Sequence, residues 1–204
     1  MISPCMTIKQ GTVYDRRKTV TEILGKNGWV GDGRIDFFAP LLHHEFDTIR
    51  GAEVGVDHGR FLFPLSFMLG RQIDIFYGID PYRVFRSFRP NATQEYWDNL
   101  YFRVLQTSFE LQENIVIVRA TSEEAACTIP DDLNFVYLDG QHGYYDLLTD
   151  INLWEEKMVC GGILSGHDYE GKYSRTVAPA VNHYAEEMGR ELKNFKGNWY
   201  WKIT

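Results

Sequence analysis

From residue 50 onward, short and almost wholly apolar runs alternate with longer stretches that are apolar on one side only. Apolar runs of four to eight residues bounded by turn residues are typical of buried strands, and one-sided stretches are typical of helices. The runs predict strands at 52–56, 73–79, 114–119, 133–138, 161–165, 192–195 and 198–203. The stretches predict helices at 60–69, 94–112, 144–158 and 176–188, and a further helix that begins at Thr121 or Ser122.

Strands that alternate with helices predict an α/β fold with a parallel sheet covered on both faces. The first 49 residues are less regular, with two short helical stretches at 19–29 and 36–46. Because no repeat or linker interrupts the chain, we expect a single domain over residues 1–204. Residues 1–49 would form a helical cap or lid segment, and residues 50–204 the core that carries the site.

Polar residues follow four of the expected strands. In open α/β sheets, ligands bind beyond the carboxyl ends of the strands. An acid in such a place is usually only a solvated loop residue, but four strand ends in succession favour a binding site. The residues are Glu53, Asp57 and His58 around the first strand, Asp80 after the second, Asp139 and His142 after the fourth, and His167 and Asp168 after the fifth.

The glycine turn after the first strand limits the choice of ligand. A dinucleotide fingerprint that starts at Gly55 would need glycine where the chain has Asp57 and Arg60, and an acid there repels a pyrophosphate. Residues 166–173 approach a phosphate loop, but Tyr173 replaces the Ser or Thr that would hold magnesium. An acidic turn instead suits a cationic ligand without phosphate.

In these features the chain resembles the class I S-adenosylmethionine-dependent methyltransferases. The segment from Glu53 to Gly59 is similar to their first motif, and Asp80 to the acid after the second strand that holds the ribose hydroxyls. The resemblance implies a Rossmann-like, mostly parallel seven-stranded sheet with helices on both faces and an antiparallel C-terminal strand. It also implies a cofactor site at Glu53, Gly55, Asp57, Gly59, Asp80, Thr121, Ser122 and Asp139.

The segment from Leu138 to Tyr144, with Asp150, Trp154 and the stretch from Gly166 to Tyr169, is more specific. It resembles the small sugar O-methyltransferases that are related to catechol-type enzymes. The resemblance implies methyl transfer from S-adenosylmethionine to a hydroxyl of a small acceptor. The expected acceptor is a sugar or glycan residue. A phenol or catechol acceptor remains open, as does a catalytically silent binding module.

A hydroxyl acceptor must lose a proton during methyl transfer, so a base or a divalent cation is needed. His142 is the expected base, because an unshifted imidazole is neutral at pH 7. Asp139 would orient His142 or act as the base itself. Metal-dependent relatives carry acids at similar positions, which implies a Mg²⁺ or Mn²⁺ site at Asp139, His167 and Asp168.

The composition and net charge of the chain limit the kinds of partner that we expect for it. The chain has 204 residues and a net charge of −7, which argues against a nucleic-acid partner. Its longest nearly apolar run, residues 61–69, is less than half of the roughly 20 residues that span a bilayer. Cys5, Cys127 and Cys160 form no regular pattern, which favours reduced thiols. We therefore expect a cytoplasmic enzyme without a membrane partner, and a homo-oligomer is compatible with the sequence.

Overall fold

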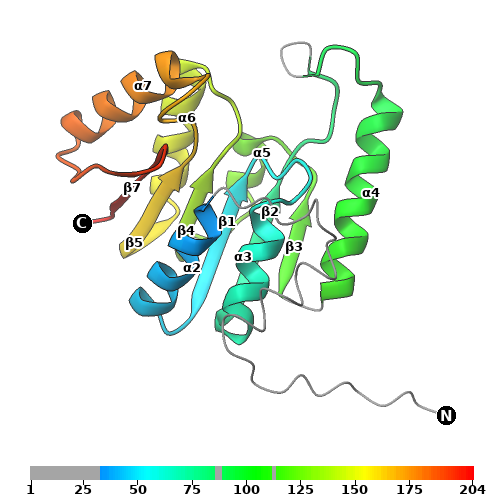
Figure 1. Ribbon diagram of the computed structural model, residues 1–204, viewed down its shortest axis with the longest axis horizontal. Helices are drawn as coiled ribbons and strands as arrows, with labels where there is room; N and C mark the ends of the chain where they lie inside the picture. The colour runs from blue at the N-terminus through cyan, green and yellow to red at the C-terminus, as the bar shows by residue number, and fades with distance from the viewer. Residues whose placement is uncertain (1–32, 86–88, 112–113) are drawn as a thin grey trace.

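The computed structural model describes residues 33–85, 89–111 and 114–204, and it contains one seven-stranded sheet with the strand order β3-β2-β1-β4-β5-β7-β6 (Figure 1). The strands are β1 (Ile49–Val54), β2 (Ile73–Ile79), β3 (Ile115–Val118), β4 (Leu133–Leu138), β5 (Met158–Gly166), β6 (Lys193–Phe195) and β7 (Asn198–Lys202). The helices are α2 (Arg34–Glu45), α3 (Leu62–Leu69), α4 (Gln94–Leu111), α5 (Ser122–Ala126), α6 (Tyr144–Glu155) and α7 (Ser174–Glu187), with a short 3₁₀ helix at Gly70–Gln72.

The first five strands are parallel to one another, and the C-terminal hairpin is added to the edge strand β5. Strand β7 runs antiparallel to β5, with Leu164 opposite Trp201, and β6 pairs antiparallel with β7. The sequence-based expectation of a Rossmann-like, mostly parallel sheet with an antiparallel C-terminal strand is confirmed. All parallel strands therefore point their carboxyl ends to the same edge of the sheet.

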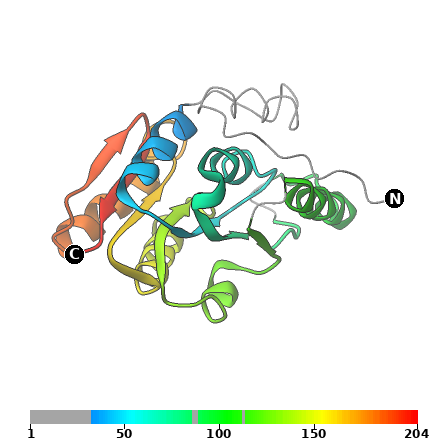
Figure 2. The same ribbon diagram turned by 90° about the horizontal axis from the view of Figure 1, so that it is seen from below.

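Helices cover both faces of the sheet, with α2, α3 and α4 on one face and α5, α6 and α7 on the other (Figure 2). Successive side chains of a strand point to opposite faces, so each strand contributes to two separate cores. In β4, Phe135 and Tyr137 belong to the α3 side, and Val136 and Leu138 belong to the α6 side. This burial on both faces explains why the strands are apolar throughout.

Several element boundaries differ from those expected. Strand β1 begins at Ile49 and ends at Val54, because Gly55 has a φ of +94° that breaks the extended backbone. Strand β5 already begins at Met158, and Gly161, with a φ of +82°, lies inside it where the pairing with β4 shifts. Helix α6 therefore ends at Glu155 rather than at 158.

The N-terminal segment is described only in part. Helix α2 begins at Arg34, two residues before the expected start, and Gly33 before it has a φ of +79°. The helix expected at 19–29 lies outside the described residues. Whether residues 1–49 act as a cap or lid, and whether the chain is one domain, stay predictions. Within the part of the chain that the structure describes, every helix is too short or too polar to cross a bilayer.

Candidate active site

The carboxyl ends of the five parallel strands line one cleft of about 810 Å³. Nine of the eleven residues expected to bind the cofactor or a metal or to act in catalysis line this cleft, and they come from the segments that follow all five strands. They are Gly55, Asp57, Asp80, Thr121, Ser122, Asp139, His142, His167 and Asp168. The volume lies within the roughly 300–1,000 Å³ of typical ligand sites.

Gly55 brings the ends of β1 and β4 into contact at the centre of the cleft. A Cβ atom at this position would lie 2.3 Å from the carbonyl oxygen of Asp139, and the φ of +94° is strained for any other residue. The neighbouring backbone bonds continue the sheet, since Asp139 N–H donates to the Val54 carbonyl at 2.8 Å. The glycine is therefore required for the close approach of these two strand ends.

Asp80 lies at the end of β2, where the sequence places the ribose-binding acid. Its two carboxylate oxygens accept the backbone N–H groups of Asp57 and Tyr82, each at 2.9 Å. Burial raises the pKa of Asp80 above its ordinary value, although these two hydrogen bonds oppose the shift. Because a carboxylate offers about four lone pairs, it still has room to accept ligand hydroxyls.

Asp57 occupies the place where related turns often have glycine, and its φ of +48° explains that preference. Its carboxylate accepts two hydrogen bonds from the Arg89 guanidinium, at 2.6 and 2.9 Å, and contacts the ring of His58 at 2.8 Å. Burial would raise the pKa of Asp57, but His58 and Arg89 outweigh burial and lower it. The side chain therefore anchors Arg89 beside the cleft.

Glu53 and Gly59 are absent from the described lining of the cleft. Glu53 is 2% exposed, accepts the backbone N–H of Leu62 at the start of α3, and has a pKa that burial raises well above the ordinary range. Gly59 has a φ of +72°, and a Cβ there would lie 2.3 Å from the ring of Phe63. In this arrangement both residues shape the turn between β1 and α3, and their cofactor contacts stay predictions.

Thr121 and Ser122 lie at the start of α5. Thr121 forms a capping box with Glu124, in which its side chain accepts the Glu124 N–H and the Glu124 carboxylate accepts the Thr121 N–H. The Ser122 hydroxyl accepts a hydrogen bond from Trp154 Nε1 at 2.8 Å and bonds to the buried Asp150. The wall of the cleft after β3 is therefore fixed to α6.

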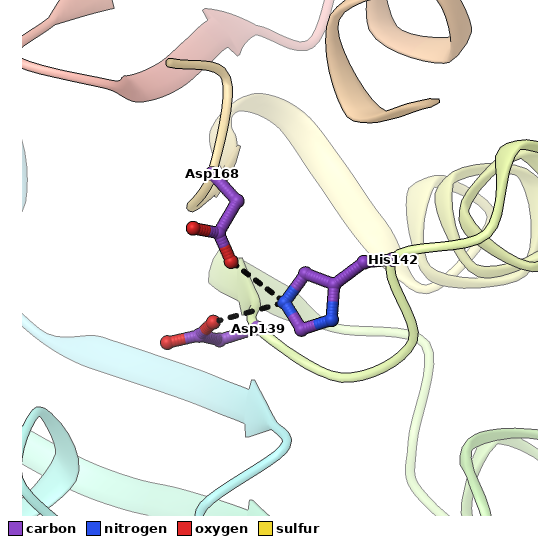
Figure 3. A group of neighbouring side chains, drawn as sticks. All are labelled: Asp139, His142 and Asp168. Atoms are coloured by element: carbon purple, nitrogen blue, oxygen red, sulfur yellow. Dashed lines mark ion pairs between the residues drawn. The ribbon is translucent and has the colours of Figure 1, made fainter. Parts of the chain in front are cut away.

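Asp139, His142 and Asp168 follow β4 and β5, on the other side of β1 from Asp80, and their side chains point toward one another (Figure 3). His142 Nε2 lies 2.7 Å from Oδ2 of Asp168 and 3.9 Å from Oδ1 of Asp139. This nitrogen is buried, faces both carboxylates and makes no well-aligned hydrogen bond to either. His167 Nδ1 lies 3.4 Å from Oδ1 of Asp168 and 3.7 Å from Oδ1 of Asp139.

The two carboxylates change the charge state of His142. Burial alone would lower its pKa, but Asp139 and Asp168 outweigh burial and raise the pKa to about 9. His142 and His167 in turn hold the pKa of Asp168 well below its ordinary range, against the effect of burial. This shift favours the protonated imidazole at pH 7, whereas the expected neutral ring assumed an unshifted pKa. The role of His142 as the base stays a prediction.

The ligand atoms of Asp139, His142 and Asp168 all lie within 4.8 Å of one another, a spacing at which they could hold one metal ion. Two carboxylate oxygens and one imidazole nitrogen form a donor set that suits Mn²⁺ or other first-row cations as well as Mg²⁺. The sequence-based set contained His167 in place of His142. The structure places both imidazoles beside the two acids, and the role of His167 as a ligand stays a prediction.

Sequence reasoning assigned no role to two residues that contact the acidic cluster. The ring of Tyr173, from the loop after β5, stacks on the ring of His142 with 4.1 Å between centroids. Arg34, at the start of α2, donates from a guanidinium nitrogen to Oδ2 of Asp139 at 3.0 Å. Tyr173 lies in the 166–173 segment that approaches a phosphate loop, but no pattern in the sequence connects Arg34 to a residue 105 positions away.

Comparison with known proteins supports the assignment of the fold. Residues 52–169, more than half of the chain, match the methyltransferase domain family. An uncharacterized protein of Acanthamoeba polyphaga mimivirus is 28% identical over 150 residues, which are 71% of this chain and 62% of that protein. The chain thus spans less than two thirds of the length of this curated relative.

Solved structures share the fold at low sequence identity. The O-methyltransferase NovP is 15% identical, with a TM-score of 0.59 over 94% of this chain and 79% of that chain. A Staphylococcus aureus protein described as a caffeoyl-CoA O-methyltransferase is 11% identical, with a TM-score of 0.61 over 92% and 91%. A Streptococcus mutans protein described as a methyltransferase, solved with S-adenosylhomocysteine, is 12% identical, with a TM-score of 0.58 over 83% and 97%.

The strand order, the cleft at the strand ends and the family match over residues 52–169 lead to the same assignment. The chain belongs to the methyltransferase domain family and has the fold of the class I S-adenosylmethionine-dependent methyltransferases.

Proposed function

We propose that the protein is an S-adenosylmethionine-dependent O-methyltransferase that methylates a hydroxyl of a small acceptor, a sugar or glycan residue. The observation that carries the proposal is the continuous cleft with Asp80 on one side and the Asp139, His142 and Asp168 cluster on the other. One side suits a nucleoside and the other suits a hydroxyl that must lose a proton. Methyl transfer needs both bound next to each other in one site.

The nucleoside would lie beside Asp80 and the start of α5. Free lone pairs of the Asp80 carboxylate would accept the ribose hydroxyls, and the backbone bonds from Asp57 and Tyr82 keep that carboxylate in place. The described lining contains seven acids and one Arg, with no Lys. Such a surface favours a cationic sulfonium and disfavours the pyrophosphate of a dinucleotide.

Asp139, His142 and Asp168 would hold a divalent cation at the acceptor end of the cleft. Such a cation would lower the pKa of a bound hydroxyl and so assist its deprotonation. His142 must give up its proton to bind a cation, and Asp139 and Asp168 stabilise whichever charge occupies the site. Asp139 remains the candidate for the residue that accepts the hydroxyl proton, and His142 is a second candidate once its ring is neutral.

The polar character of this end favours a sugar over a phenol. The segments after β4 and β5 present Gln141, Asp146 and Asp168, whose oxygens can accept hydrogen bonds from several hydroxyls. Tyr173 is the aromatic lining residue of these two segments, and one face of its ring is covered by His142. A catechol ring would find little apolar surface here.

A comparison of acceptors tests the substrate class. Initial rates with free sugars, glycosides and catechols, each with and without added Mg²⁺ or Mn²⁺, should give the highest kcat/KM for a sugar or glycoside. A preference for catechols would reject the sugar assignment and retain the O-methyltransferase. Binding of NAD in place of S-adenosylhomocysteine in calorimetry would reject both.

A further inference from the structure

Helix α2 delivers one charged side chain to the site. Arg34 is the first residue of this helix, and its side chain is 12% exposed. The guanidinium lies over the ring of Phe61 at 5.6 Å and over the ring of Tyr137 at 6.0 Å from the ring centres. Aromatic faces attract a guanidinium and restrict its plane. The position of this cation is therefore fixed by packing as well as by charge.

A chain of hydrogen bonds sets the direction of the guanidinium. The Tyr137 hydroxyl donates to Oδ1 of the buried Asn198 at 2.7 Å, so its lone pairs remain available to Arg34, which approaches at 3.4 Å. The same guanidinium nitrogen donates to Oδ2 of Asp139 at 3.0 Å. Strand β7, strand β4 and helix α2 thus act together on one carboxylate.

The two oxygens of Asp139 therefore face different partners. Oδ2 is bound to Arg34, and Oδ1 faces His142 at 3.9 Å and His167 at 3.7 Å. Arg34 itself is not part of the described lining of the cleft. It contacts Asp139 from outside the cleft and leaves Oδ1 for whatever binds inside.

We infer that Arg34 is a positioning residue for methyl transfer, because it holds Asp139 with Oδ1 directed into the cleft. The inference rests on the proposed function. The inference gives the first residue of α2 a role in methyl transfer through its contact with Asp139. It also predicts an effect at the acceptor end, because the Arg34 guanidinium contacts Tyr137 and Asp139 there.

Steady-state kinetics of Arg34→Gln and Arg34→Lys, with S-adenosylhomocysteine binding by calorimetry, test this inference. We expect Arg34→Gln to lower kcat about 100-fold, because small misplacements of reacting groups cost that much, with the dissociation constant of S-adenosylhomocysteine unchanged within about twofold. Arg34→Lys keeps a charge but not the stacked plane, so kcat should fall about tenfold. Arg50→Gln removes another partly buried Arg, from the opposite end of the sheet, and should leave kcat unchanged.

A second comparison separates positioning from general loss of structure. If Arg34 acts through Asp139, the double variant Arg34→Gln/Asp139→Asn should be no slower than Asp139→Asn alone. Unchanged kcat in Arg34→Gln, or equal loss of kcat and of S-adenosylhomocysteine affinity, would overturn the inference. Should Arg34→Gln fail to fold, Arg34→Lys with unchanged kcat would overturn it. A wild-type protein without methyl transfer to any acceptor would instead overturn the proposed function.

Discussion

Nε2 of His142 lies 2.7 Å from Oδ2 of Asp168, although the two residues follow different strands of the sheet. Strands β4 and β5 are adjacent and parallel, so the segments after them begin side by side. Asp168 has a φ of +58°, a left-handed conformation that aspartate adopts more often than most residues other than glycine. This backbone conformation accompanies the ion pair between Asp168 and His142 at the end of β5.

The cation site gives the first prediction. Wild-type protein should bind Mn²⁺, as measured by calorimetry or electron paramagnetic resonance, and Asp168→Asn and His142→Ala should each weaken binding by at least about tenfold. His167→Ala distinguishes the two ligand sets. A small effect supports Asp139, His142 and Asp168, and a loss as large as that of His142→Ala supports a ligand role for His167. A wild-type protein that binds no divalent cation would refute the site.

Asp80 gives the second prediction. Asp80→Ala removes the acceptor for two ribose hydroxyls, and each hydrogen bond to a charged acceptor contributes about 1.5–3 kcal/mol. Calorimetry should therefore show binding of S-adenosylhomocysteine weakened by at least about 100-fold. Asp74→Asn changes an exposed acid of the same strand that pairs with Arg50, and it should not alter binding. Equal affinity of Asp80→Ala and wild type would place the ribose elsewhere.

Substitution of Gly55 and of Gly171 by Ala distinguishes the cost of backbone strain from the cost of a steric collision. Both have a φ near +93°, but a Cβ at Gly55 would collide with the Asp139 backbone, whereas a Cβ at Gly171 would have no neighbour within 4 Å. In denaturant unfolding, Gly171→Ala should lower the free energy of unfolding by about 1 kcal/mol, the cost of the left-handed conformation. Gly55→Ala should lower it by at least about 3 kcal/mol. Equal losses would show that the close approach of β1 to β4 is not needed.

The buried carboxyl group of Asp150 should make the free energy of unfolding depend on pH. Burial raises its pKa to about 6 from 3.8, so between about pH 4 and pH 6 the folded state binds a proton that the unfolded state releases. The contribution of this group to the free energy of unfolding therefore falls as pH rises through that window, by up to about 3 kcal/mol.

Asp150→Asn removes the ionisable group and keeps an oxygen for the bond to Ser122. This variant should be more stable than wild type at pH 7.5 and no more stable at pH 4, as measured by urea unfolding at both values. Asp131→Asn, which neutralises a largely exposed acid, should follow the wild-type pH dependence. Lower stability of Asp150→Asn at pH 7.5 would contradict the assigned cost of burying this charge.

Local sequence patterns predicted those parts of the site that depend on strand ends. Asp80, Asp139 and Asp168 each follow an apolar run, and parallel strands bring such positions to one edge of the sheet. The exact limits of β1 and β5 were missed because they depend on the conformations of Gly55 and Gly161. A glycine in the sequence does not reveal whether it ends a strand or bends it.

Properties that arise only from packing between distant segments could not be predicted. The contact of Arg34 with Asp139 joins an N-terminal helix to a strand end, and nothing in the spacing of these residues reveals it. The pKa of about 9 for His142 depends on two carboxylates that approach from different segments. Local patterns therefore located the acids, whereas their mutual arrangement required the structure.

The most direct test of the central claim is methyl transfer itself. The protein is incubated with S-adenosylmethionine that carries a deuterated methyl group and with single sugars or glycosides, and the products are analysed by mass spectrometry. We predict a sugar product that carries one labelled methyl group, formed with stoichiometric S-adenosylhomocysteine, and a rate roughly 10²–10⁴-fold lower for His142→Ala. Absence of a labelled product from every hydroxylated acceptor, while S-adenosylhomocysteine still binds, would contradict the account.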